Sequence, residues 1–315
     1  MMPPMPDAGA PPISLAYSAD ADDAFMFHAI RAGLIDTQGF SFTHWRGDTA
    51  ALNRLALGQG RQVRGSATSA AAAAEPDVIA DVIADVIAIS AGVYPRVAAR
   101  YQLLPHGASV GRGFGPVVVA RAPMSTAKLA GLRVGIPGLT TTAWLVLRLI
   151  QPAAVPVEIP IVPFARIFDA LTAGEVDAAL LIHEGRLLYR ERGLHQVVDL
   201  GEWWLAESGL PLPLGVNVIR RGLGPDRIAA LSAVLRESIR FALDHRSDLI
   251  AALATEDRGD KKLSDPALLD HYLELYANQD TLSLAADARQ ATAVLFDRAR
   301  KAGLLEGEVA LDWAP

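Results

Sequence analysis

The feature that most constrains the fold is the alternation of short apolar runs with longer segments of helical periodicity. Apolar runs typical of buried strands stand at "ISLAYS" (13–18), "GPVVVAR" (115–121), "LRVGIPG" (132–138), "DAALLI" (177–182) and "LPLPLGVNVIRR" (210–221). Between these runs, and after the last of them, apolar residues recur at the 3.6-residue period of a helix. Strands that alternate with helices predict an α/β fold with mainly parallel sheets.

The order of the runs predicts two lobes joined by two chain crossings. We expect "GPVVVAR" to leave the first lobe and "LGVNVIRR" to return to it. This assigns residues 13–120 and 216–315 to lobe 1 and residues 121–215 to lobe 2. Open α/β sheets bind ligands at the carboxyl ends of their strands, where loops and helix N-termini converge. The functional site is therefore expected at strand ends, in a central cleft between the lobes.

A threefold repeat interrupts lobe 1, because "EPDVIADVIADVIAIS" (75–90) contains Asp-Val-Ile-Ala three times. Val-Ile pairs favour a strand, but a slip of four residues keeps every side chain on its face. The repeat itself therefore does not select the copy that enters the sheet. An Ala/Ser-rich stretch precedes it, and we predict a low-complexity insertion at about 61–84. The Pro-rich residues 1–12 are predicted to form a disordered leader.

Composition excludes several classes of function. The chain has no cysteine, which excludes disulfides, thiolate metal sites and cysteine nucleophiles. A net charge of −6 with scattered basic residues gives no electrostatic footprint for nucleic acid. The start has no signal-peptide pattern, and no apolar run approaches the roughly twenty residues of a membrane span. We therefore expect a cytoplasmic protein without a membrane span.

His183 stands directly after the apolar run "AALLI", at the carboxyl end of a predicted strand. A histidine in such a place can act as a general base, and the alternative is a structural histidine bonded to a backbone carbonyl. Strand alternation sends Glu184 to the opposite face together with Arg186, so we predict an ion pair between these two. A zinc site of the zincin type needs a second histidine where Leu187 and Leu188 stand, so no zinc is predicted.

The segment "GIPGLTTTAW" ends a predicted strand with a glycine turn and opens a helix on three threonines. Free N–H groups and hydroxyls at the positive end of a helix dipole suit a carboxylate or a phosphate. Thr141 and Thr142 are therefore candidate ligand-binding residues. The alternative is ordinary capping of the helix by Thr140 or Thr141.

An acidic loop, "YSADADDAF", places Asp20, Asp22 and Asp23 at the carboxyl end of the first strand. Their carboxylates can accept hydrogen bonds from a polyhydroxylated ligand, and the alternative for Asp22 is capping of the next helix. A calcium loop of the EF-hand type is rejected, because its sixth position is Phe25 and its twelfth is Arg31.

Two further motifs are weaker signals. "GRGFG" (111–115) precedes a strand and does not link a strand to a helix, so it cannot form a nucleotide-binding phosphate loop. Arg112 within it is a candidate anion contact. Trp203 and Trp204 can stack on a flat ligand, although such a pair also suits the core.

Taken in order, several long segments resemble one enzyme family. They are "AISAGVYPRVAARYQLLPHGASVGRGFGPVVVAR", "VGIPGLTTTAWLVLRL", "GEVDAALLIHEGRLLY" and "GLHQVVDLGEWWLAESGLPLPLGVNVIRR". They resemble the 1,4-dihydroxy-6-naphthoate synthases of the futalosine route to menaquinone, and the match runs from residue 13 over nearly the whole chain. That family is similar in fold to type II periplasmic binding proteins, which have two lobes and a cleft. The resemblance thus agrees with the two predicted crossings.

The resemblance implies a carbon-carbon lyase that needs no cofactor. Its implied reaction converts cyclic dehypoxanthinyl futalosine to 1,4-dihydroxy-6-naphthoate. The family's proposed catalytic base falls on His183, and its cleft hydroxyls fall on Ser90, Thr141 and Thr142. We expect a neutral His183 to take a proton from the substrate, after which the carbon-carbon bond breaks as the aromatic ring forms.

The same resemblance assigns the two ends of the substrate. The threonine end of the cleft is expected to hold the substrate carboxylate. The acidic loop, with Asp20 and Asp22, and Ser90 are expected to hold the sugar-derived hydroxyls. It also selects the last copy of the repeat as the strand, because only residues 85–89 lead directly into Ser90 and "YPRV".

Two alternatives remain beside this interpretation. One is a solute-binding protein that keeps the fold and has no chemistry. The other is the related chorismate dehydratase. The His-Glu motif and the paired tryptophans favour the naphthoate synthase.

Overall fold

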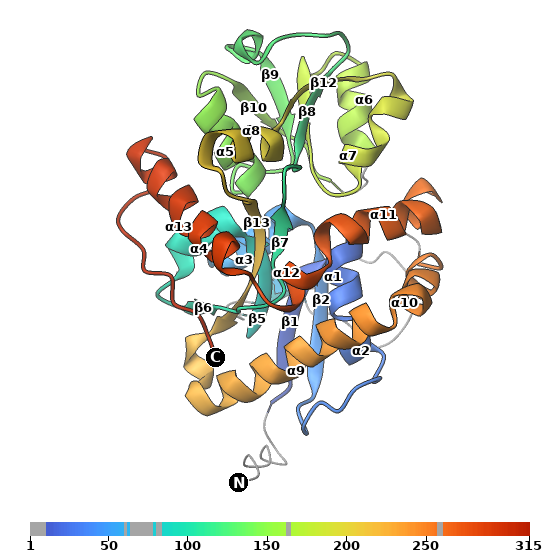
Figure 1. The fold of residues 1–315 in the computed structure, drawn as a ribbon, viewed down its shortest axis with the longest axis vertical. Coiled ribbons are helices and arrows are strands. Elements are labelled where there is room, and N and C mark those ends of the chain that lie inside the picture. Colours follow the sequence, from blue (N-terminus) through green and yellow to red (C-terminus); the bar gives the residue numbers. More distant parts are fainter. Residues whose placement is uncertain (1–10, 60–61, 64–77, 80–83, 162–164, 257–260) are drawn as a thin grey trace.

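The computed structural model describes residues 11–59, 62–63, 78–79, 84–161, 165–256 and 261–315, and it shows two α/β lobes (Figure 1). Each lobe is built on its own sheet. The predicted leader, except for its last two residues, and most of the predicted insertion lie outside the described residues. In the described part of the chain, no helix is both long and apolar enough to cross a membrane.

The sheet of lobe 1 has six strands. Its order is β2-β1-β5-β13-β6, and β7 also pairs with β13. The strands are β1 (Ile13–Ser18), β2 (Phe42–Gly47), β5 (Val86–Ser90), β6 (Tyr101–Leu103), β7 (Ser109–Gly111) and β13 (Leu212–Arg220). Strand β1 runs parallel to β2 and β5, whereas β13 runs antiparallel to β5, β6 and β7.

The sheet of lobe 2 has five strands in the order β10-β9-β11-β8-β12. They are β8 (Val117–Ala120), β9 (Arg133–Ile136), β10 (Val155–Glu158), β11 (Ala178–Leu181) and β12 (His195–Asp199). Strands β9, β10 and β11 are parallel, whereas β8 is antiparallel to both of its neighbours. The prediction of mainly parallel sheets is therefore wrong for the two crossing strands, β8 and β13. Each enters its sheet from the other lobe and runs antiparallel to its neighbours.

The two chain crossings lie together at the waist of the molecule (Figure 1). Strand β8 pairs only with strands of lobe 2, and β13 pairs with strands of lobe 1 from Leu212 onward. We therefore propose lobe boundaries at about 112–116 and 209–211. These lie a few residues before the boundaries at 120 and 215 that the sequence suggested.

Helices cover both faces of each sheet. They are α1 (Ala21–Met26), α2 (His28–Arg31), α3 (Thr49–Ala56), α4 (Tyr94–Val97), α5 (Thr142–Ile150), α6 (Arg166–Thr172), α7 (Gly185–Leu188), α8 (Leu200–Ser208), α9 (Pro225–Asp244), α10 (Arg246–Leu253), α11 (Pro266–Tyr276), α12 (Gln279–Leu282) and α13 (Ala286–Lys301). In lobe 1, α9 packs with Leu15 and Tyr17 of β1, and α3 and α13 pack with Ala16 on the other face. Alternate residues of β1 thus enter different core clusters.

Side-chain and backbone groups near the waist fix several element ends. The segment after the acidic loop forms two short helices, α1 and α2, which meet at Phe27. Asp48 caps α3 by accepting a hydrogen bond from the Ala51 N–H group. Trp204 is fully buried, and its indole N–H group donates to the Pro211 carbonyl, so Trp204 belongs to the core. Trp203 is partly buried and packs against the same core.

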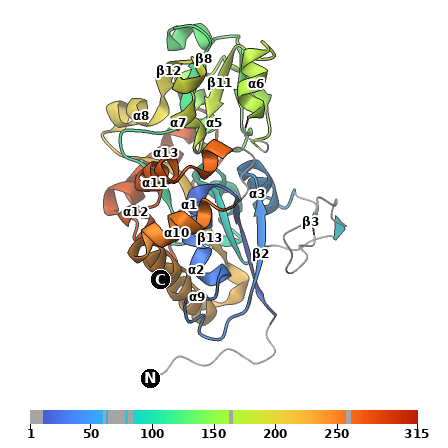
Figure 2. The same cartoon turned by 90° about the vertical axis from the view of Figure 1, so that its right-hand side faces the viewer.

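The last copy of the repeat enters the sheet as β5 (Val86–Ser90), as the resemblance predicted. Asp85 fixes the amino end of this interior strand, because its carboxylate accepts from the Ser14 N–H group at 3.0 Å and from the Arg220 guanidinium at 2.6 Å. A slip of four residues would place Asp85 at the buried position of Ile89. In the first copy, β4 (Val78–Ile79) pairs with β3 (Gln62–Val63) in a separate two-stranded sheet (Figure 2).

The assignment of the last copy can be tested with substitutions at equivalent places in the repeat. We expect Asp85→Ala to lower the free energy of unfolding by roughly 2 to 4 kcal/mol, because Arg220 and Ser14 lose a buried charged partner. Denaturant unfolding measures this change. The matched controls Asp77→Ala and Asp81→Ala should change the same quantity by less than about 0.5 kcal/mol. Equal destabilisation by Asp81→Ala would show that another copy of the repeat forms the strand.

Candidate active site

A pocket lies between the two lobes. Its walls come from the ends of β1, β5 and β13 and from α11 in lobe 1, and from the end of β11 and the start of α5 in lobe 2. Strand ends therefore meet at this place, as the order of the strands predicted. A concave site between two lobes is a common place for a small organic ligand.

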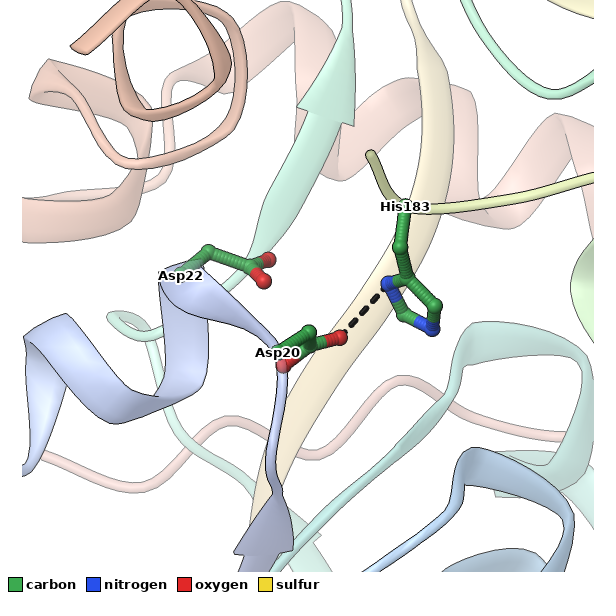
Figure 3. Close-up of side chains that lie close together, drawn as sticks. All are labelled: Asp20, Asp22 and His183. Atoms are coloured by element: carbon green, nitrogen blue, oxygen red, sulfur yellow. Dashed lines mark ion pairs between the residues drawn. The ribbon is translucent and has the colours of Figure 1, made fainter. Parts of the chain in front are cut away.

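The central contact joins Asp20 of lobe 1 to His183 of lobe 2 (Figure 3). Asp20 follows β1, His183 follows β11, and the distance from Nδ1 to Oδ2 is 2.6 Å. His183 has a φ of 50°, a left-handed conformation that a residue with a side chain adopts at a cost. Strain of this kind at a pocket residue points to a functional constraint on the position of the side chain.

Three hydroxyl groups surround this pair. The Thr49 hydroxyl lies 3.0 Å from Nε2 of His183. The Tyr272 hydroxyl donates to Asp22 at 3.1 Å and lies 3.4 Å from Nδ1 of His183. The Ser109 hydroxyl donates to the other oxygen of Asp22 at 2.7 Å. Residues from α3, α11 and β7 therefore fix the imidazole and the second carboxylate.

Electrostatic interactions within the pocket shift its pKa values strongly. Burial lowers the pKa of His183, but the charge and hydrogen bond of Asp20, with the charges of Asp22 and Glu184, raise it to about 9. Burial and the Asp20 charge raise the pKa of Asp22 to about 7. Burial and the two neighbouring aspartates also raise the pKa of Asp23. The expected neutral imidazole is thus not the main form of the unliganded site at neutral pH.

The same residues form the one cluster in the described part of the chain that could hold a metal ion. The donor atoms of Asp20, Asp22 and His183 all lie within 4.8 Å of one another. Two carboxylates and an imidazole suit several divalent cations. However, the 2.6 Å contact between Asp20 and His183 is a hydrogen bond, and an ion would have to separate these atoms. That no metal takes part stays a prediction.

The predicted ion pair between Glu184 and Arg186 is wrong. Arg186 pairs with Asp199 at 2.8 Å and donates to the Gly115 carbonyl. The Glu184 carboxylate accepts from the Ala21 N–H group at 3.2 Å, at the start of α1. The reason is local: the backbone leaves the strand conformation at His183, so strand alternation no longer applies to Glu184.

The threonine end of the pocket combines capping with a contact between lobes. Thr141 caps α5 by accepting from the Trp144 N–H group, which is the alternative that the sequence left open. The Thr142 hydroxyl accepts from the Gly92 N–H group at 3.1 Å and donates to the Leu214 carbonyl at 2.7 Å. Both threonines line the pocket, but the hydrogen of the Thr142 hydroxyl is already bonded to protein.

Ser90 lies at the same end of the pocket, where Asn53 of α3 holds it. The Ser90 hydroxyl accepts from the Asn53 amide at 3.0 Å, and the Ser90 N–H group donates to the same side chain at 2.9 Å. Because Ser90 accepts from Asn53, its own hydroxyl hydrogen can be donated to a ligand.

Arg112 does not line the pocket. Its guanidinium makes two bonds to Asp280 of α12, at 2.6 and 2.9 Å, and it also pairs with Asp287 of α13 at 2.7 Å. The two carboxylates come from segments more than 160 residues away, which the local motif could not reveal. Arg112 therefore fastens C-terminal helices, and its predicted role as an anion contact has no support in the geometry.

Comparison with known proteins gives a match along nearly the whole chain. The menaquinone biosynthesis family matches residues 77–301. A 1,4-dihydroxy-6-naphthoate synthase of Thermus thermophilus is 36% identical over 93% of this chain and 95% of its own. One of Streptomyces coelicolor is 39% identical over 69% of this chain and 76% of its own. The chain belongs to the menaquinone biosynthesis family.

Solved structures agree with the two-lobed fold. A protein of Archaeoglobus fulgidus, 36% identical, superposes with a TM-score of 0.79 and covers 93% of this chain and 98% of its own. The alkanesulfonate-binding protein of Xanthomonas axonopodis is 14% identical, with a TM-score of 0.64, and covers 96% of each chain. The second likeness shows the fold alone, which is the predicted periplasmic-binding-protein-like fold.

Sequence reasoning missed several polar residues in and around the pocket, among them Thr49, Asn53, Ser109 and Tyr272. Three of them lie in helices, and Ser109 begins the short strand β7. One signal was available, because Thr49 follows a capping aspartate and so opens a helix beside a strand end. The others contact the site from distant parts of the chain.

The coupling between Asp20 and His183 predicts a measurable pKa change. Asp20→Asn removes the negative charge that stabilises the imidazolium, so the pKa of His183 should fall from about 9 toward the ordinary value near 6.5. An NMR titration of the histidine signals, assigned with a His183 variant, measures it. Asp177→Asn, which breaks an exposed ion pair with Arg133, is the control and should leave this pKa unchanged. A His183 pKa that stays near 9 in Asp20→Asn would contradict the assignment.

Proposed function

We propose that the protein converts cyclic dehypoxanthinyl futalosine to 1,4-dihydroxy-6-naphthoate, as a carbon-carbon lyase that needs no cofactor. The observation that carries this proposal is the Asp20–His183 pair, held in a strained conformation in a pocket between two lobes. The sequence identity to named synthases over nearly the whole chain supports the choice of substrate. A solute-binding protein has no need of such a pair.

His183 is the proposed base, and its Nε2 atom is the reactive one. Nδ1 contacts Asp20, which leaves Nε2 at the pocket wall beside Thr49. Nε2 takes a proton from a ring carbon, and the released electron pair forms the new ring double bond as the carbon-carbon bond breaks. The leaving sugar-derived fragment keeps the bonding pair and receives a proton from the imidazolium, so protons and electrons balance. Asp20 stabilises the imidazolium in between.

The charges of the pocket orient the substrate. Asp20, Asp22 and Asp23 crowd one end and would repel a carboxylate there. At the other end, the first turn of α5 offers N–H groups that have no intrahelical acceptor, and Ser90 offers a hydroxyl. We place the substrate carboxylate at this second end and the sugar-derived hydroxyls at the acidic end. This differs from the sequence-based expectation that Ser90 binds the sugar-derived hydroxyls, because Asn53 holds the Ser90 hydroxyl beside the Thr140 carbonyl at the threonine end.

Activity of the purified protein tests the proposal directly. With cyclic dehypoxanthinyl futalosine we expect 1,4-dihydroxy-6-naphthoate to appear, followed by liquid chromatography. His183→Gln should fold, bind the substrate and lose turnover by roughly 10² to 10⁴, the usual worth of a general base. Normal turnover by His183→Gln would remove His183 from the mechanism. Loss of the fold together with activity would favour a structural histidine.

The raised pKa of His183 also predicts the pH dependence of the reaction. A base acts only when deprotonated, and with a pKa of about 9 roughly one molecule in a hundred carries neutral His183 at pH 7. We therefore expect kcat/KM to rise with pH, by about tenfold per unit, up to about pH 9. In Asp20→Asn the rise should end at a lower pH, with a maximal rate reduced by roughly 10² to 10⁴. A profile that is flat from pH 6 to 9 in the unsubstituted protein would argue against His183 as the base.

A further inference from the structure

Asn217 is a buried amide on the wall of the pocket that the mechanism above does not use. It lies on β13 opposite Ala88 of β5, and it is 2% exposed. Its strand neighbour on the same face, Ile219, belongs to an apolar cluster with Val86. A carboxamide therefore stands where the pocket meets an apolar core.

The side-chain oxygen of Asn217 is the part of this amide that the described residues leave unexplained. Among the described residues, its Oδ1 atom has no hydrogen-bond partner. The amide packs on the backbone of Gly107, where an added Cβ atom would lie 2.0 Å from Nδ2. Gly107 thus leaves room for this amide. An unsatisfied buried polar group costs free energy, and a ligand that bonds to it would remove that cost.

We infer that Asn217 binds a hydroxyl group of the sugar-derived part of the substrate, an inference that rests on the proposed function. Gly107, which contacts the amide, lies two residues before Ser109, which donates to Asp22. This contact links Asn217 to the acidic side of the pocket, where hydroxyls are accepted. A carboxamide presents a donor beside an acceptor, which matches a hydroxyl group or two adjacent hydroxyls.

The experiment compares substrate and product. Affinities are measured by calorimetry in the His183→Gln background, where the substrate binds without turnover. Asn217→Leu, which keeps the approximate shape and removes the polar atoms, should weaken binding of cyclic dehypoxanthinyl futalosine by roughly tenfold or more. Binding of 1,4-dihydroxy-6-naphthoate, which lacks the sugar-derived part, should not change. The melting temperature of ligand-free Asn217→Leu should stay the same or rise, because an unsatisfied polar group is lost.

Ile219→Val is the matched control, since it changes the same strand and face two residues away from Asn217 and does not line the pocket. It should lower the melting temperature and leave both affinities unchanged. Unaltered substrate affinity in Asn217→Leu would overturn the inference. Equal losses of substrate and product affinity with a lower melting temperature would do so too, because they indicate a structural amide. Failure of the proposed function shows separately, as absence of turnover in the unsubstituted protein. In that case the melting temperature of ligand-free Asn217→Leu still tests the inference. A large fall relative to the unsubstituted protein would show a structural amide and overturn it.

Discussion

The contact between Asp20 and His183 is the interaction on which the arrangement of the pocket depends. It joins the end of β1 in lobe 1 to the end of β11 in lobe 2, so it exists only when the two sheets face each other at this distance. The strained φ of His183 aims the imidazole across the pocket, and Thr49 and Tyr272 hold it from two helices of lobe 1. Glu184 adds a second contact from lobe 2 to the start of α1. The local cost in strain and desolvation is thus balanced by contacts that also fix the relation between the lobes.

Sequence reasoning reached the two lobes and the place of His183 and the acidic loop from periodicity, whereas the type of fold and the proposed roles of the residues came from the family resemblance. Parallel strands bring their carboxyl ends to one edge, so a histidine after one apolar run and an acidic loop after another could be assigned to one pocket. Their pairing could not be predicted, because nothing in either motif gives the angle between the lobes. The error at Glu184 has the same origin: alternation assumes that strand geometry continues, and the chain turns at His183. Arg112 shows that ion-pair partners cannot be predicted from a local motif, since both of its partners lie on helices much later in the chain.

The repeat shows how a register that is open locally becomes fixed by the rest of the fold. Each copy offers the same aspartate and the same Val-Ile pair, so the contacts of Asp85 with Ser14 and Arg220 do not distinguish the copies by themselves. What distinguishes them is the sequence that follows. Only the last copy continues into the apolar Ile89 and then into Ser90, which Asn53 holds at the pocket. A slipped copy would bury a carboxylate in an apolar cluster and remove the pocket hydroxyl.

In the proposed mechanism, the three aspartates of the first loop account for both the orientation of the substrate and the strength of the base. Their crowding in a desolvated pocket raises the pKa of Asp22 and Asp23, and the negative charge that remains raises that of His183. A stronger base takes a proton from carbon more readily, but it is neutral in a smaller fraction of molecules at neutral pH. The substrate groups that lie beside the aspartates therefore affect the pKa of His183 as well as the affinity for the substrate. Hydroxyls of the substrate can donate to the aspartates and spread their charge without neutralising it, whereas a carboxylate placed there would raise the pKa of His183 further and leave less of the neutral base. In this proposal, the same charges thus set the orientation of the substrate and the availability of the base.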